Sequence, residues 1–252
     1  MSTSMLTRVR AGRPVDTSPS PPALTAVVFV VTLAVSVAAL VSPALMRLFV
    51  RDRPLLLAGQ WWRVVTPVVV QPSGWGQLVF NLLGIAVVGA ALQRHLGWAG
   101  WSLIYLVGGS GSIAVYSAWH PADTGGGSSA AVAALIGALA ILLAVRDGRG
   151  GLEWFAQLYS VFFAVYLTAL DLGGVAPSII AGNATIIVMV AARRAFSPTA
   201  VTRTCLGVVV SAGIVMTAVR DDHGVGIVIG LAVAGLVLAR RAMIALPQTP
   251  RV

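Results

Sequence analysis

The chain has 252 residues, of which 58% are hydrophobic and only 10% are charged, whereas a soluble domain carries about 25% charged residues. Several apolar runs approach the roughly 20 residues that cross a bilayer core. This composition excludes a soluble single-core protein and predicts an all-α membrane protein with several passes. The formal net charge is +9, but the arginines form short clusters between apolar runs. That pattern indicates membrane topology and argues against a nucleic-acid partner.

The N-terminal 22 residues are rich in Ser, Thr, Pro and Arg and predict a disordered tail. A membrane domain is expected over 23–242, followed by a short tail at 243–252. The first apolar run lacks a small-residue cleavage site, so it is predicted to be a retained helix. About eight transmembrane helices are predicted, at 24–45, 75–92, 99–118, 128–145, 152–170, 174–192, 204–219 and 223–239.

The arginines also predict an orientation for these helices. With the N-terminus inside, most arginines fall in the inner segments, as the positive-inside rule requires. Both termini are then expected in the cytoplasm. The starts of the helices at 128–145 and 223–239 are expected at the outer face of the membrane.

The connection over residues 46–74 is unusual because it contains "GQWWRVVTPVVVQPSGW". It is too polar to span the membrane and too apolar for a plain linker. Its tryptophans suit a membrane interface. A loop of this length without an obvious element of its own is usually functional or partly embedded.

The stretch "GGGSSAAVAALIGALA" begins at Gly125 and places Ser129 at the start of a predicted helix. Unpaired backbone N–H groups and the positive end of the helix dipole lie there. A serine in this place can simply cap the helix. Ser128 could cap equally well, which leaves Ser129 without an obvious structural need. The following face of Ala130, Ala133, Ala134, Gly137 and Ala138 would let another helix approach closely.

The last apolar run, "DDHGVGIVIGLAVAG", offers such a partner helix. His223, Gly226 and Gly230 share one helix face, and a neutral imidazole within reach of a hydroxyl is the minimal activated nucleophile. In the helix over 75–92, Asn81 and Gln77 lie one turn apart and carry amide donors. A polar side chain in an apolar span is often functional, although an interhelical hydrogen bond without chemistry also explains it.

Several segments, in this order, resemble motifs of the rhomboid intramembrane serine proteases. They are "WWR" with Trp62 and Arg63, "QLVFNLLG", "LIYLVGGSG", "GSSA" and "HGVGIVIG". The resemblance implies a rhomboid-like helical bundle in which Ser129 is the nucleophile and His223 the general base. It further implies Asn81 and Gln77 as oxyanion donors, transmembrane proteins as substrates, and no cofactor or metal. The expected protein is an intramembrane serine endopeptidase of a bacterial plasma membrane.

The chain also departs from the family pattern. Gln77 stands where the family has histidine, and Ala130 where glycine is common. The span at 174–192 follows the fifth helix but has no histidine, so two interpretations stay open. Either a helix pair is inserted and His223 is the base, or the base is lost and the protein is an inactive rhomboid-like binder of transmembrane segments. His120 is the alternative base.

Overall fold

The computed structural model describes residues 22–146 and 150–245, with side chains described from 22 to 145 and from 150 to 240. The tail predicted for the first 22 residues therefore lies almost wholly outside the described residues. In the tail expected from residue 243, the last helix continues to Ala245, and the remaining residues are not described.

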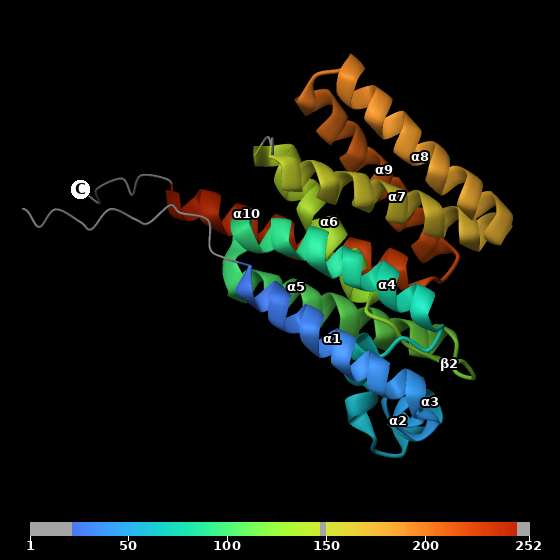
Figure 1. Cartoon of the computed structure of the whole chain (residues 1–252). Helices are drawn as coiled ribbons and strands as arrows, with labels where there is room; N and C mark the ends of the chain where they lie inside the picture. Colours follow the sequence, from blue (N-terminus) through green and yellow to red (C-terminus); the bar gives the residue numbers. More distant parts are fainter. Residues whose placement is uncertain (1–21, 147–149, 246–252) are drawn as a thin grey trace, which may run out of the picture.

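The described residues form a bundle of helices with one very small sheet (Figure 1). The helices and strands are α1 (Ala23–Val41), α2 (Pro43–Phe49), β1 (Arg51–Asp52), α3 (Arg53–Leu57), the 3-10 helices η1 (Trp61–Val64) and η2 (Thr66–Val69), α4 (Trp75–Gly84), the π-helical turn η3 (Ile85–Gly89), α5 (Ala90–Trp119), β2 (Thr124–Gly125), α6 (Ser129–Arg146), α7 (Gly151–Gly173), α8 (Val175–Ala195), α9 (Pro198–Ala218) and α10 (Asp222–Ala245).

The predicted helical membrane bundle is confirmed. Among the described residues, six helices are long and apolar enough to cross a membrane, if the 45 residues from Trp75 to Trp119 count as one helix. That helix is interrupted at Gly97, whose φ of 72° is not helical. The chain reverses at this break, so that α4 and the longer part of α5 lie as two separate helices in Figure 1 and the segment supplies two passes. With the shorter apolar helix α6, each predicted apolar segment corresponds to a helical segment.

Helix α6 forms the centre of the bundle. Its side chains from Ala130 to Ala134 are at most 1% exposed, and α5 and α10 pack closely against it. A β-carbon at Gly226 of α10 would overlap the carbonyl of Ala130, and one at Gly230 would overlap the carbonyl of Ala134. Helices in lipid associate through such small residues because their backbones can approach closely. The two pairs advance in the same direction, so α6 and α10 run parallel.

Helix α8 lies at the edge of the bundle and packs mainly on α7 (Figure 1). It makes a smaller contact with α9, and most of its apolar side chains face away from the protein. The helix beside α6 is therefore α10, and α9 packs on α10, α7 and α6, whereas α8 lies outside α7. The histidine-bearing helix thus packs beside α6 although α8 and α9 precede it in the chain.

The connection over residues 46–74 has regular structure, contrary to the expectation of a loop without elements of its own. The helix predicted over 24–45 ends at Val41, because Ser42 caps a new helix that starts at Pro43. Asp52 caps α3 in the same way, through a bond from the N–H of Leu55. Capping side chains and prolines in the first helical turn are local signals of a helix. The sequence analysis judged the segment by its overall polarity and missed them.

Strand β1 belongs to this connection and pairs antiparallel with β2, which lies just before α6. Arg51 pairs with Gly125, and Asp52 with Thr124. The connection over residues 46–74 is thereby attached to the glycine-rich entry of α6.

Candidate active site

The glycine-rich entry of α6 makes a sharp turn directly before Ser129. Gly127 has a φ of 144°, a conformation that residues other than glycine rarely adopt. Its N–H donates to the carbonyl of Pro67 over 2.9 Å. The turn is thus fixed against η2, and Ser129 follows as the first residue of α6.

The two adjacent serines have different environments. Ser128 is fully buried, and its hydroxyl accepts a hydrogen bond from Gln71 Nε2 at 3.0 Å. Ser129 is only half-buried. Within residues 22–146 and 150–245, no hydrogen bond involves its hydroxyl. Ser128 has the structural role, and Ser129 is left with a free hydroxyl at the helix start.

Gln71 connects the serine turn to α4 and was missed by the sequence analysis. Its Oε1 accepts a hydrogen bond from Asn81 Nδ2 at 2.7 Å, and both side chains are fully buried. Asn81 Oδ1 is also buried and has no hydrogen-bond partner among the described residues. The available signal was a lone amide in the apolar run "VVVQP", but nothing local pointed to its partners.

Gln77 reaches the same turn from the first part of α4. Its Nε2 donates to the carbonyl of Gly126 at 3.0 Å, and its Oε1 accepts from the N–H of Ser73 at 2.9 Å. A β-carbon at Gly127 would overlap Gln77 Nε2 and would lie 3.2 Å from Ser129 Oγ. The Gln77 amide and the Ser129 hydroxyl therefore border the same small space.

His223 lies in the first turn of α10 and interacts with the residues just before it. Its Nδ1 is 2.7 Å from Asp221 Oδ1 and 3.3 Å from Asp222 Oδ1. The edge of its ring contacts Phe163 of α7, with ring centroids 5.8 Å apart. Because Gly226 lies against Ala130 and α6 runs parallel to α10, the first turns of both helices lie at the same end of the bundle. The part of the chain that the structure describes contains no hydrogen bond between His223 and Ser129.

The loop before α10 carries an ionised carboxylate. Burial raises the pKa of the Asp221 carboxyl, but attraction to His223 and hydrogen bonds to the carboxylate outweigh burial and hold that pKa below its usual value. Asp221, Asp222 and His223 are also the one group of described residues whose metal-ligating atoms cluster, within 4.8 Å. In the structure the imidazole Nδ1 of His223 contacts both carboxylates directly.

His120, the alternative base, is engaged elsewhere. Its Nε2 lies 3.1 Å from the carbonyl oxygen of Arg220, and its ring packs on Tyr116 at a centroid distance of 4.3 Å. These contacts join the end of α5 to the turn before α10 and do not include Ser129.

Arg63, from the "WWR" segment, is buried and organises the connection over residues 46–74. Its Nε donates to Gln60 Oε1 at 2.8 Å, and its Nη1 donates to the carbonyls of Arg47 and Val50 at 2.9 and 2.7 Å. The arginine therefore holds the ends of α2 and η1 together, at a distance from the serine turn.

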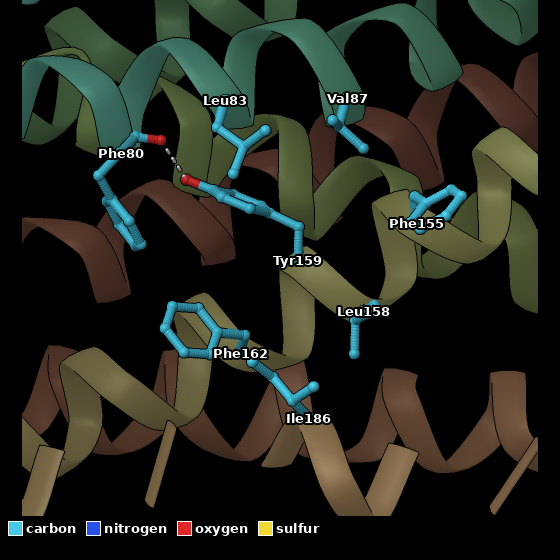
Figure 2. Close-up of a pocket in the computed structure, with 8 residues that line it drawn as sticks. All are labelled: Phe80, Leu83, Val87, Phe155, Leu158, Tyr159, Phe162 and Ile186. Carbon is cyan, nitrogen blue, oxygen red and sulfur yellow. Dashed lines mark hydrogen bonds between the residues drawn. The ribbon is translucent and has the colours of Figure 1, made fainter. Parts of the chain in front are cut away.

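An apolar cavity of about 350 Å³ lies beside α4, between this helix, α7 and α8 (Figure 2). Figure 2 shows Tyr159 at its wall, donating from its hydroxyl to the carbonyl of Phe80 at 2.9 Å. Phe80 directly precedes Asn81 in α4. The cavity is lined by Phe80, Leu83, Val87, Phe155, Leu158, Tyr159, Phe162 and Ile186.

The fold and site define a polytopic helical membrane protein with a free serine at the start of its central helix. Residues 58–181 match the Rhomboid domain. This match covers just under half of the chain and supports a rhomboid family protein. The matched range includes Gln71, Gln77, Asn81 and Ser129, and it ends within α8, before His223.

Three relatives are similar over part of the chain. Rhomboid protease GluP of Bacillus subtilis (strain 168) is 39% identical over 92 residues, which cover 35% of this chain and 17% of that protein. Putative rhomboid protease YdcA of the same organism is 31% identical over 116 residues, or 45% of this chain and 57% of that protein. RHOMBOID-like protein 9, chloroplastic, of Arabidopsis thaliana is 38% identical over 85 residues, which cover 33% of this chain and 19% of that protein. The alignments thus span from under a fifth to just over half of the length of these relatives.

Proposed function

We propose that the protein is an intramembrane serine endopeptidase that cleaves transmembrane protein substrates, with Ser129 as nucleophile and His223 as general base. The observation that carries the proposal is the parallel packing of α6 and α10 through Gly226 and Ala130, next to a Ser129 hydroxyl without a hydrogen bond. A hydroxyl and an imidazole in the first turns of two closely packed helices are suited to nucleophilic catalysis.

In this mechanism, Ser129 Oγ attacks the scissile carbonyl carbon and its proton passes to His223 Nε2. The C–N bond then breaks as the imidazolium gives its proton to the leaving amine, which leaves an ester on Ser129. Water hydrolyses the ester with the same imidazole as base, and Ser129 regains its proton.

The oxyanion formed in each step needs hydrogen-bond donors. The backbone N–H groups in the first turn of α6 have no intrahelical partners, and the Gln77 and Asn81 amides border the same turn. Both amides donate to protein oxygens in the structure, Gln77 to Gly126 and Asn81 to Gln71. Substrate must therefore displace at least one of these bonds, and hydrogen bonds at catalytic sites often tighten only with substrate bound. Losing one oxyanion donor typically costs about 100- to 1000-fold in rate.

The apolar cavity beside α4 supports the choice of substrate class. It lies on the helix that carries Gln77 and Asn81, and its walls offer apolar side chains from three helices. A transmembrane segment has side chains of matching chemistry. Its backbone could reach the serine turn only after local unwinding, because the carbonyls of an intact helix are hydrogen-bonded.

A second candidate function is an inactive rhomboid-like protein that binds transmembrane segments. The observation that favours it is the missing hydrogen bond between Ser129 and His223, together with the engaged amides of Gln77 and Asn81. Binding of a helical client that is unchanged in Ser129→Ala and His223→Ala would support this function. Cleavage of the client that either variant abolishes would exclude it.

Labelling with a fluorophosphonate probe tests the proposal on the full chain in detergent micelles. We expect the wild type to be labelled and Ser129→Ala to be unlabelled. The matched control is Ser128→Ala, which keeps the Ser129 hydroxyl and should still be labelled. If the wild type reacts no more than Ser129→Ala, the endopeptidase function is wrong.

We further propose a bacterial plasma membrane location with both termini in the cytoplasm. In support, α1 begins and α10 ends at the same end of the bundle, at the left of Figure 1. Reporter fusions at the two termini test the orientation, and reporters on opposite sides would contradict it.

A further inference from the structure

We propose that Asp221 is a positioning residue that holds the His223 imidazole, through Nδ1, in the tautomer and orientation in which Nε2 is the base. The inference rests on the proposed function and adds a third residue to the pair of Ser129 and His223. The sequence analysis assigned Asp221 no role in the site.

One carboxylate oxygen of Asp221 holds both the backbone and the ring of His223. Asp221 Oδ1 accepts the His223 backbone N–H at 2.8 Å and lies 2.7 Å from Nδ1. A contact with two points of the same residue fixes the direction of the ring relative to its own helix.

The charge of Asp221 determines the tautomer of His223. Attraction to His223 and hydrogen bonds outweigh burial and keep the Asp221 pKa below its usual value, so the carboxylate is ionised at neutral pH. An ionised carboxylate only accepts hydrogen bonds, and the ring nitrogen facing it must therefore carry the proton. In the neutral imidazole this leaves the lone pair on Nε2, which is the state that a general base requires.

Helix capping alone could account for part of this geometry. Asp221 directly precedes α10, and a carboxylate in that place commonly accepts the N–H of the second helical residue. Capping explains the bond to the His223 backbone, but it does not require the bond to the ring. The two roles can be separated, because asparagine and serine also cap helices well and lack the negative charge.

Other charged and titratable groups surround His223 and must be considered in any pH profile. Asp222 is the second carboxylate near Nδ1, at 3.3 Å, and it makes no hydrogen bond with the ring. Asp171 of α7 also acts electrostatically on His223. Arg51 of β1 acts electrostatically on Asp222, and Asp222 acts on Tyr116 of α5. The first turn of α6 contributes no charged side chain.

The test is the rate of fluorophosphonate labelling of the full chain in micelles, measured from roughly pH 5 to pH 11, so that the plateau is reached although two carboxylates beside Nδ1 favour the imidazolium. In this reaction the bond from Ser129 Oγ to phosphorus forms, the P–F bond breaks, fluoride leaves and the serine proton passes to His223 Nε2. The variants are Asp221→Asn and Asp221→Ser, which keep a cap, with Asp222→Asn as the matched control. Thermal unfolding of each variant reports on the fold.

We expect Asp221→Asn and Asp221→Ser to lower the plateau rate at high pH by roughly 100-fold, because the ring is no longer held in the required tautomer. Their unfolding temperatures should stay near that of the wild type. Asp222→Asn removes a charge of the same sign from the same nitrogen without removing a hydrogen bond. In the pH profile of the labelling rate, this change should move the rise in rate to lower pH, because the imidazolium loses a negative neighbour. The plateau rate at high pH should stay within about threefold of the wild type.

Plateau rates within about threefold of the wild type in both Asp221 variants would overturn the inference and leave Asp221 as a helix cap. Loss of the fold in both variants would also overturn it, since Asp221 would then be structural. Failure of the proposed function is distinguished from these results by Ser129→Ala, which would be labelled as fast as the wild type.

Discussion

Gly226 of α10 lies against the backbone carbonyl of Ala130 in α6, so closely that any β-carbon would overlap the carbonyl oxygen. Ala130 directly follows Ser129, and Gly226 lies one helical turn after His223. This single contact therefore sets the distance between the helix of the proposed nucleophile and the helix of the proposed base.

Gly226→Ala is expected to destabilise the protein by about 1–3 kcal/mol, because the added methyl group forces α10 away from α6. Fluorophosphonate labelling should fall at the same time. Thermal unfolding in detergent measures the stability.

The matched control for this change is Gly207→Ala in α9. A β-carbon there meets nothing within 4 Å, so the helix should be unchanged or stabilised by up to about 1 kcal/mol. Equal effects of the two substitutions would contradict the close packing of α6 and α10.

Replacing the two adjacent serines should separate stability from reactivity. Ser128→Ala leaves the buried Gln71 amide without its acceptor and should cost about 1–3 kcal/mol in the free energy of unfolding. Ser129→Ala removes no hydrogen bond of the described residues and should stay within about 0.5 kcal/mol of the wild type. Both variants are measured by thermal unfolding and by probe labelling. If the same variant has the larger effect in both assays, the two serines do not have separate roles.

Gln71 and Asn81 should be energetically coupled. Gln71→Leu leaves the Asn81 amide unpaired, Asn81→Leu leaves the Gln71 oxygen unpaired, and each should cost about 1–3 kcal/mol. The double variant removes both polar groups and should be more stable than the sum of the single effects implies, by about 0.5–3 kcal/mol. A double-mutant cycle on unfolding free energies measures the coupling, and simple additivity would be evidence against the bond.

Gly127→Ala is expected to reduce labelling as well as stability, because its β-carbon would displace the Gln77 amide from the serine turn. The control is Gly59→Ala, where φ is 98° and no atom lies within 4 Å. Both substitutions should introduce backbone strain of about 1–3 kcal/mol. Only the change at Gly127 should lower the labelling rate, and equal rates in the two variants would indicate that Gln77 does not act at the site.

Hydropathy along the chain was enough to predict the helical segments and the close face of α6. The helical segments follow from the transfer of apolar side chains into lipid. The close-packing face of α6 follows from the small size of side chains at helical spacing. Both are local properties of the sequence. The fixed spacing of Gly226 and Gly230 likewise identified the helix that packs beside α6. At the start of α6 the sequence offered Ser128 and Ser129 equally as caps, and the structure shows the Ser128 hydroxyl bonded to Gln71.

Contacts between distant segments could not be predicted in the same way. Gln71 meets Ser128 across 57 positions of the chain, and no local pattern encodes that pairing. The interruption at Gly97 and the short helices between α1 and α4 depend on individual glycines, prolines and caps within apolar sequence. Asp222 is the neighbour of His223 in sequence, but among the described residues its carboxylate makes no hydrogen bond to the ring. The structure instead brings Asp221 Oδ1 to the ring, because the chain turns before α10 begins.

The length of α6 has a consequence for the backbone around the site. Its 18 residues rise about 27 Å, somewhat less than the roughly 30 Å of a hydrocarbon core. Where α6 spans a bilayer, the non-helical stretch before Ser129 would complete the crossing, at a depth where every peptide group needs a partner from the protein. The bond from Gly127 N–H to Pro67 and the bond from Gln77 to the Gly126 carbonyl supply such partners. Gln77 thus makes irregular backbone tolerable below the membrane surface, a requirement that holds whether or not a substrate is bound.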